Sequence, residues 1–172
     1  MLRTLLADRF KLRVHTVSRE MPVFALVLAR KDGALGPGLR RSDKDCAAFS
    51  TAVLKAEQAG VGPLRVNGCD YRAGGGPAGI TIHATIALDA AALMMSRSRD
   101  IDRPIVNRTG LDGTFDLDLQ FAERQTSAPG ALAADRPSIF TAVQEQLGLK
   151  LESQRAPMDV VVSDAVERPS PD

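Results

Sequence analysis

A pair of carboxylates is the strongest candidate for chemistry in this sequence. Asp116 and Asp118 stand two residues apart in the alternating segment 114–121, so on a β-strand their side chains lie on one face, roughly 7 Å apart. Asp112 stands just before them in an Asp-Gly turn. Two carboxylates at this spacing can share a hard cation, or one can bind the cation while the other acts as a general base.

The Asp-Gly dipeptide lies between two apolar segments, which is typical of a two-residue β-hairpin turn. We therefore expect the strands on either side of it to pair with one another. In that register Thr109 lies opposite Asp116. Likewise, Asn107 lies opposite Asp118. Carboxylate and amide oxygens are hard ligands, so the predicted set for Ca²⁺ or Mg²⁺ is Asn107, Asp112, Asp116 and Asp118.

A cation at this position would polarise the carbonyl group of a small ester or lactone, while Asp116 or Asp118 acts as the base toward water. On this interpretation the protein is a metal-assisted hydrolase with a small-molecule substrate. The plainer interpretation is a solvated outer face, whose aspartates are neutralised by Arg103 and Arg108. The protein is then a non-catalytic binding module, which presents a sheet edge or the long loop of residues 33–79 to a protein partner.

The histidines and cysteines add little to either interpretation. His15 and His83 fall on the polar faces of alternating segments, where a solvated side chain is expected, and two histidines are too few for a His-rich zinc centre. Cys46 and Cys69 leave two alternatives open, a disulfide or two partly buried free thiols. Residues 74–76 are three glycines without the Lys-Ser or Lys-Thr of a phosphate-binding loop, so they predict a flexible loop.

The composition predicts a globular domain. Of the 172 residues, 44% are hydrophobic and 25% are charged, which suffices for a core, and the aromatic share of 4% predicts that this core is aliphatic. A net charge of +1 gives no reason to expect nucleic acid or an anionic membrane as a partner. No apolar run reaches the length of a membrane span, and the charged N-terminus is too short for a signal peptide, so the chain as written reads as cytoplasmic.

Hydrophobic periodicity divides the chain into short elements. A weak helical stretch lies at 51–59, and residues 122–137 read as a linker. Ser138 is a suitable N-cap, and Gly148 a suitable stop, for the last helix. In chain order the pattern predicts a helix at 2–10, strands at 11–15, 23–29 and 80–86, a helix at 89–95, strands at 105–106 and 114–121, a helix at 138–147, and strands at 149–152 and 158–162.

Two segments of the chain share one pattern. Residues 2–25 and 139–162 each read as helix, strand, turn and strand, and the block 80–121 contains the same unit. We therefore expect two or three related α-β-β units. Because their strands are mostly linked as hairpins, the prediction is a single α+β domain spanning residues 1–172, with a largely antiparallel sheet.

Three stretches of the chain carry a resemblance to known proteins: residues 5–12 with 22–27, residues 103–111 with Gly113, Phe115 and Asp116, and residues 144–151. Together they resemble a family of soil-bacterial proteins of unknown function that is abundant in Acidobacteria. The resemblance implies an α+β domain and an envelope or secreted location, and it implies no reaction. Family members usually carry further sequence before the first helix, so the chain resembles a version that lacks this N-terminal part. Asn107 stands where the family tends to have Asp, and Asp112 where a neutral residue is common.

Overall fold

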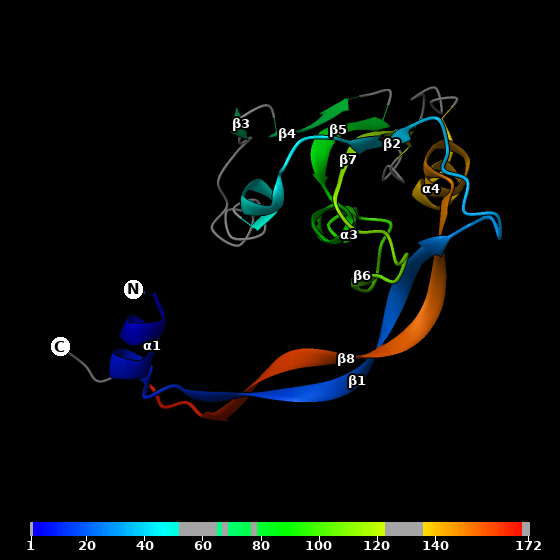
Figure 1. Cartoon of the computed structure of the whole chain (residues 1–172). Coiled ribbons are helices and arrows are strands. Elements are labelled where there is room, and N and C mark those ends of the chain that lie inside the picture. Colours follow the sequence, from blue (N-terminus) through cyan, green and yellow to red (C-terminus); the bar gives the residue numbers. More distant parts are fainter. Residues whose placement is uncertain (1, 52–64, 67–68, 77–78, 123–135, 170–172) are drawn as a thin grey trace, which may run out of the picture. The chain divides into compact units, whose positions relative to one another are not determined.

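The computed structural model describes residues 2–51, 65–66, 69–76, 79–122 and 136–169 (Figure 1). Its helices are α1 (Leu2–Phe10), α3 (Leu88–Met95) and α4 (Ile139–Leu147), and a helical turn covers residues 47–51. Its strands are β1 (Arg13–Leu28), β2 (Leu39–Ser42), β3 (Arg65–Val66), β4 (Cys69–Gly76), β5 (Gly79–Ala87), β6 (Ile105–Asn107), β7 (Thr114–Phe121) and β8 (Leu149–Ala165).

The strands form two sheets. Five strands follow the order β2-β7-β5-β4-β3, and each neighbouring pair in this sheet is antiparallel. The other sheet has the order β6-β1-β8, and β6 runs parallel to β1. Helices packed with mainly antiparallel sheets confirm the predicted α+β class.

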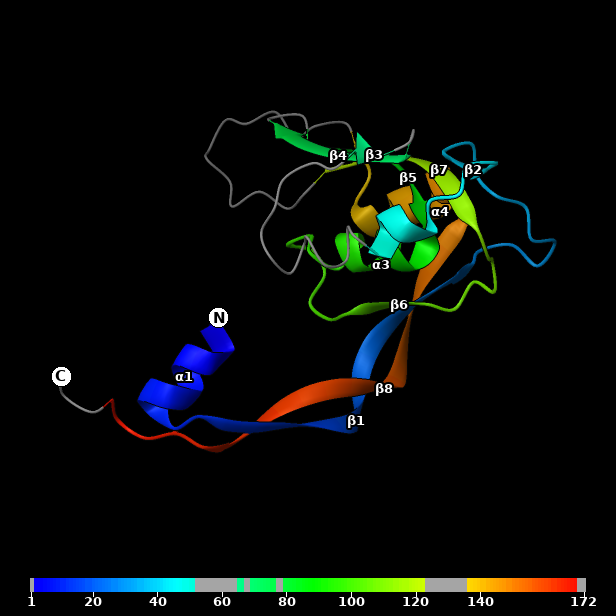
Figure 2. The same cartoon turned by 60° about the vertical axis from the view of Figure 1, so that its left-hand side comes forward.

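The core lies on one side of the five-stranded sheet. The helices α3 and α4 and the turn at 47–51 all lie on that side, as the two views in Figures 1 and 2 show. Along β7, residues 115, 117, 119 and 121 are buried against them, while residues 116, 118 and 120 are half-buried or exposed. The side-chain alternation of a strand therefore separates an apolar inner face from a polar outer face.

Several predicted elements are confirmed. The strand predicted at 114–121 matches β7, and the one predicted at 80–86 lies within β5. The last helix begins as expected, because the Ser138 hydroxyl accepts a hydrogen bond from the Thr141 N–H at 3.3 Å. It ends at Gly148, whose φ of 68° is the left-handed conformation that glycine adopts without strain.

The two long strands differ from the prediction. The breaks expected between 11–15 and 23–29, and between 149–152 and 158–162, lie inside the continuous strands β1 and β8. The physical reason is their partner: β1 and β8 are hydrogen-bonded neighbours, so each continues along the other without a turn. Each terminal segment is therefore a helix followed by one strand.

The predicted Asp-Gly hairpin is wrong. β6 pairs with β1 in the three-stranded sheet, whereas β7 pairs with β5 and β2 in the other sheet. Thr109 is consequently not paired with Asp116, and Asn107 is not paired with Asp118. Gly113 does adopt a positive φ of 96°, but the turn it makes belongs to a loop that crosses from one sheet to the other. The Asp-Gly dipeptide correctly predicted a turn, but it does not determine which strands pair with one another.

The segment 33–79 contains more regular structure than expected. It includes β2, the turn at 47–51, β3 and β4, and the glycines at 74–76 lie in β4 rather than in a loop. Most of the helix predicted at 51–59 and most of the linker at 122–137 fall outside the described residues. The core is mainly aliphatic, as expected, although its largest fully buried side chains are Phe115 and Phe121.

The chain divides into two compact units. Unit 1 consists of Met1–Pro22 and Arg155–Asp172, and unit 2 consists of Val23–Gln154. Unit 2 holds both helices α3 and α4 and the whole five-stranded sheet. Unit 1 holds α1 and a two-stranded ribbon made by residues 13–22 of β1 and 155–165 of β8, which we call the unit 1 ribbon.

A side chain completes the outer edge of β7 in unit 2. β2 pairs with residues 114–117 of β7, and the Asp118 N–H donates to the Gly38 carbonyl oxygen at 2.8 Å. Beyond that point the Gln146 Oε1 accepts from the Gln120 N–H at 2.9 Å, and the Gln146 Nε2 donates to the Gln120 carbonyl oxygen at 2.7 Å. The side-chain amide of Gln146 thus makes the two backbone hydrogen bonds that a neighbouring strand would otherwise make with Gln120.

We expect Gln146→Ala to lower the free energy of unfolding by about 1–2 kcal/mol, because two hydrogen bonds to the β7 backbone are lost. Gln144→Ala is the matched control, since Gln144 is exposed on the same helix, and it should change stability by less than about 0.5 kcal/mol. Urea denaturation measures both variants. Equal stability for the two would show that the amide contributes nothing to the edge.

Candidate functional site

The outer face of the five-stranded sheet brings together charged side chains from neighbouring strands. In the antiparallel pairing of β5 with β7, His83 lies opposite Asp118, and Thr85 lies opposite Asp116. Arg72 of β4 lies opposite His83. Arg40 of β2 lies opposite Asp116. We call this group the polar face; its members are Arg40, Arg72, His83, Thr85, Asp116 and Asp118.

Both aspartates of the polar face have hydrogen-bond partners on β5. The Thr85 hydroxyl donates to the Asp116 Oδ1 at 2.7 Å. The Nδ1 of His83 is hydrogen-bonded to the Asp118 Oδ1. The side chains of this His-Asp pair remain 53% and 59% exposed, so the pair is solvated as well as bonded.

Asn107 and Asp112 lie outside the polar face. The Asn107 Oδ1 accepts hydrogen bonds from the Thr109 N–H at 3.1 Å and from the Thr109 hydroxyl at 2.8 Å, which is a local turn interaction at the end of β6. Asp112 is exposed in the loop before β7, where its carbonyl oxygen accepts from the Arg41 Nη1 at 3.0 Å. Of the predicted ligand set, the structure therefore places Asp116 and Asp118 together on one strand face.

The part of the chain that the structure describes contains no group of three or more His, Cys, Asp or Glu side chains that could hold a metal ion. On the polar face the two aspartates have arginines and a histidine as their neighbours across the strands. Cross-strand neighbours of opposite charge stabilise a sheet modestly without any bound ion. The polar face thus carries side chains of both charges, and the guanidinium group of Arg72 is bonded to Asp70 of its own strand.

Sequence reasoning missed His83 as a partner of Asp118. Both residues fall on the polar faces of alternating segments, and that signal was visible. The register that brings them together was not visible, because His83 and Asp118 stand 35 positions apart in the sequence. A carboxylate at Nδ1 favours the tautomer that carries its proton on Nδ1, and in a neutral ring this leaves Nε2 as a hydrogen-bond acceptor.

The same arrangement occurs a second time. In unit 1 the Nδ1 of His15 lies 2.8 and 2.9 Å from the two carboxylate oxygens of Asp164. Both histidines of the chain thus bind an aspartate through Nδ1. Because two exposed sites share this geometry, the His-Asp pair alone does not distinguish a catalytic site from a cross-strand contact.

Arg103 does not neutralise the aspartates of β7. Its Nε and Nη2 donate to the two carboxylate oxygens of Asp102, both at 2.9 Å, and its guanidinium lies 4.8 Å from the centre of the Phe24 ring. Phe24 in turn meets Phe140 edge-on, with 5.3 Å between ring centres. The hydrogen bonds from Arg103 lower the pKa of Asp102 below its usual range.

The thermal stability of the protein should therefore fall at acid pH. The Lys150 ammonium likewise lowers the pKa of Glu152. A carboxyl group whose pKa is lower in the folded state stabilises the fold above its unfolded-state pKa, and this contribution is lost as the pH falls through the folded-state pKa. Because unfolded carboxyl groups titrate near about pH 4, we expect the Tm to fall below that pH, and to fall less in Asp102→Asn. A Tm that falls equally in the variant would contradict the role of this pair.

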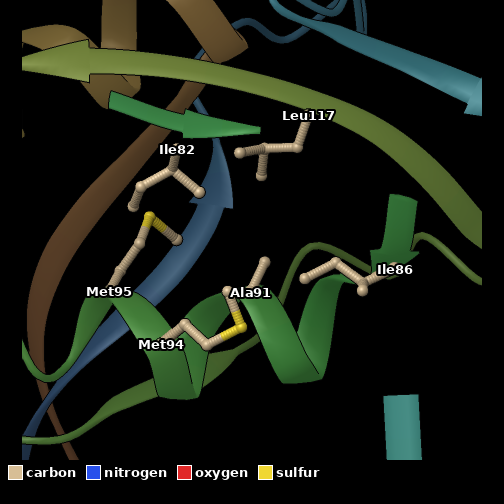
Figure 3. A pocket seen from close by; sticks show the side chains of 6 residues that line it. All are labelled: Ile82, Ile86, Ala91, Met94, Met95 and Leu117. Atoms are coloured by element: carbon tan, nitrogen blue, oxygen red, sulfur yellow. The ribbon is translucent and has the colours of Figure 1, made fainter. Parts of the chain in front are cut away.

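A small apolar hollow lies beneath the sheet (Figure 3). Ile82 and Ile86 of β5, Leu117 of β7, and Ala91, Met94 and Met95 of α3 line it. The hollow leaves no space for a water molecule, and it is lined without polar atoms. Two flexible methionines are typical fillers of irregular core gaps, so the hollow is part of the packing between α3 and the sheet.

Unit 1 has an unusual surface. Of the six large hydrophobic side chains that are exposed in the described part of the chain, four belong to unit 1: Leu5, Met21, Val161 and Val166. Val161 and Val166 are 64% and 65% exposed. Among the described residues of unit 1, Ala156 is the single one that is buried. The unit therefore leaves these four large apolar side chains exposed, and most of its other described apolar side chains are half-buried.

Comparison with known proteins gives the chain a family. A family model described as "Protein of unknown function (DUF3738)" matches residues 1–166. The chain belongs to this family. No curated protein and no solved structure matches the chain. The match to DUF3738 covers all of unit 2, and it covers unit 1 up to residue 166.

The family assignment carries no reaction, substrate or location with it. Within the part of the chain that the structure describes, no helix combines the length and the apolar character needed to cross a membrane. What this DUF3738 domain does must therefore be inferred from its own surfaces, of which the polar face and the unit 1 ribbon are the two candidates.

Proposed function

We propose that this DUF3738 domain is a non-catalytic interaction module, and that unit 1 is the part that binds a protein partner. The observation that supports this proposal is the exposure of four large apolar side chains in unit 1, together with the burial of Ala156 alone among its described residues. Contiguous exposed apolar surface on a soluble protein commonly marks a binding surface. A domain that exposed such a unit permanently would face aggregation.

The architecture of the unit 1 ribbon supports the same proposal. The strands β1 and β8, which continue into it, have 16 and 17 residues over their whole length, whereas strands in globular proteins typically have about 5–6 residues. An isolated two-stranded ribbon is marginally stable in water unless another surface packs against it. β8 is an edge strand, so its outer backbone groups can pair with a further strand.

The partner is then a protein segment of defined chemistry. It pairs its backbone with the free edge of β8 and covers apolar side chains such as Val161 and Met21. Strand addition of this kind takes its affinity from main-chain hydrogen bonds and its specificity from alternate side chains. The exposed Asp159 on β8 would favour a partner strand that carries basic residues.

Hydrogen exchange on the purified chain tests the physical basis of this proposal. Amides in the unit 1 ribbon should exchange about 100-fold faster than those of β5 and β7, because few buried contacts hold the ribbon closed in the absence of a partner. The β5 and β7 amides serve as the internal reference. A ribbon as well protected as β5 and β7 would show that unit 1 is complete by itself, and the proposal would fail.

A second candidate function is the hydrolysis of a small ester or lactone at the polar face. The hydrogen bond between His83 and Asp118 favours it, because it orients Nε2 of His83 as a general base. Water would lose a proton to Nε2 as its oxygen attacks the carbonyl carbon, and the same proton would pass to the departing alkoxide. A Ca²⁺ or Mg²⁺ ion on the free oxygens of Asp116 and Asp118 would polarise the carbonyl.

Turnover of a small aryl ester and of a lactone, with added Ca²⁺ or Mg²⁺ and with chelator, tests the second candidate. His83→Ala and Asp118→Asn should abolish turnover, whereas His15→Ala should preserve it. His15 is the matched control because it forms the same pair with Asp164 in unit 1. Background rates in the parent protein and in every variant would contradict this function. Equal losses of turnover in His15→Ala and His83→Ala would contradict it as well.

We further propose that α1–β1 and α4–β8 are related copies of one α-β unit. Each consists of a nine-residue helix followed by a strand of 16 or 17 residues, and the two strands pair with one another. On this proposal both copies need a surface on which to pack. The rest of unit 2 provides this surface for α4 and β8, and a partner that covers unit 1 would provide it for α1 and β1.

A further inference from the structure

The middle of the chain is closed by a disulfide. Cys46 and Cys69 are bonded, with 5.8 Å between their Cα atoms, and they stand 23 residues apart in the sequence. Of the two alternatives that the sequence left open, the structure therefore shows the disulfide. The bond connects the residue before the helical turn at 47–51 to the first residue of β4.

Both cysteines lie deep in unit 2. Cys46 is 1% exposed and Cys69 is 2% exposed, and both belong to the main hydrophobic core. Hydrogen bonds hold the adjoining turn on the sheet. The Cys46 N–H donates to the hydroxyl of Thr114 at 3.3 Å, and the Ala87 N–H donates to the hydroxyl of Ser50 at 3.0 Å. The turn that adjoins the disulfide is therefore fixed to the ends of β5 and β7.

We infer that the Cys46–Cys69 bond is formed while the chain folds, before residues 46–50 pack onto the sheet, and that the packed domain shields it from thiols. Thiol–disulfide exchange requires a thiolate to reach a sulfur atom directly. Once Cys46 and Cys69 are buried, neither an oxidant nor a reductant can reach their sulfur atoms without local opening. The bond therefore forms most readily before burial, and after burial both its oxidation and its reduction must wait for local opening.

The oxidation follows a defined sequence. The thiolate of one cysteine attacks the disulfide of a low-molecular-weight or protein oxidant, which forms a mixed disulfide and releases one thiolate of that oxidant. The thiolate of the second cysteine then attacks the mixed disulfide, which forms the Cys46–Cys69 bond and releases the second thiolate. The two cysteine thiols lose two protons and two electrons, and the oxidant's disulfide becomes two thiols.

This maturation step assigns the domain to an oxidising compartment. Structural disulfides persist where disulfide donors are present and are rare where glutathione keeps thiols reduced. Cys46 and Cys69 are the two cysteines of the sequence, and with both in this bond the domain has no thiol left for redox chemistry of its own. The bond therefore acts as a structural link between the residue that precedes the turn at 47–51 and the first residue of β4.

Refolding of the reduced, unfolded chain in mixed reduced and oxidised glutathione tests formation. The reaction is stopped at intervals with a maleimide, and peptide mapping identifies the bonded cysteines. We expect nearly complete conversion to the Cys46–Cys69 bond. Final products that retain two free thiols, or that carry glutathione on either cysteine, would overturn the inference.

Reduction of the oxidised chain tests the shielding. Dithiothreitol should break the bond about 100-fold more slowly in the native chain than in concentrated urea, because attack on the native bond requires local opening. A short disulfide-linked peptide corrects for the effect of urea on the chemical step. Equal rates in the native and the unfolded chain would overturn the inference, because they would place the bond within reach of solvent thiols.

Discussion

Replacement of Phe115 by alanine is expected to lower the free energy of unfolding by about 3–5 kcal/mol, the largest effect that we foresee for one substitution. Phe115 is fully buried on the inner face of β7, and it is among the largest side chains in the core. Removing its ring leaves a cavity in unit 2 that the surrounding strands and helices can fill only partly.

The neighbouring positions of β7 supply the control for Phe115→Ala. Gln120 is exposed on the outer face of the same strand, and Gln120→Ala should change stability by less than about 0.5 kcal/mol. Urea denaturation measures both, and Phe115→Leu keeps the comparison measurable if the alanine variant is recovered unfolded. Similar losses from the inner and the outer position would contradict the assignment of the two faces of β7.

The second large effect is expected from removal of the disulfide. The double variant Cys46→Ser, Cys69→Ser should lose about 3 kcal/mol of stability, because the bond closes a 23-residue separation and restricts the unfolded chain. For a chain of this length the loss corresponds to a fall in Tm of about 6–12 °C. Part of the loss comes from placing two hydroxyl groups in an apolar environment.

Cys46→Ala, Cys69→Ala separates these two contributions, because alanine adds no polar group. The alanine variant should still be clearly less stable than the oxidised parent and should be insensitive to dithiothreitol. Thermal melting followed by circular dichroism, with and without reductant, measures all three proteins. A parent whose Tm is the same in its oxidised and its fully reduced forms would contradict a stabilising role for the bond.

The local elements of this fold could be predicted from the sequence where a single periodicity and clear end signals coincide. β7 alternates from Thr114 to Phe121 without interruption, and the alternation sets its inner and outer faces. α4 combines an apolar stripe with a serine N-cap and a glycine after its last turn. Both kinds of signal depend on residues within one element, so the sequence around the element suffices to read them.

The pairing of the strands could not be predicted in the same way. The Asp112-Gly113 dipeptide marks a turn, but β7 pairs with β5 and β2, and β6 pairs with β1. That choice is decided by burial across the whole domain rather than by the turn. The continuity of β1 and β8 escaped prediction for a related reason, since each strand is extended by its partner at the other end of the sequence.

The candidate site was predicted in part. Alternation placed Asp116 and Asp118 correctly on one face of β7. The residues opposite them are determined by the strand register alone. His83 lies opposite Asp118, where Asn107 was expected, and Thr85 lies opposite Asp116, where Thr109 was expected. The unit 1 ribbon was missed for a different reason: residues 16–22 and 153–157 read as turns when each strand is considered without its partner.

The most direct test of the proposed function is site-specific photo-crosslinking in living cells. A photoreactive amino acid is placed at Val161 on β8, at Met21 on β1, or at Asp89, an exposed control position on α3. Binding of a protein to the unit 1 ribbon predicts adducts of the same mass from the first two positions and none from the control. The absence of an adduct at both ribbon positions, or an equal yield at Asp89, would contradict an interaction module that works through unit 1.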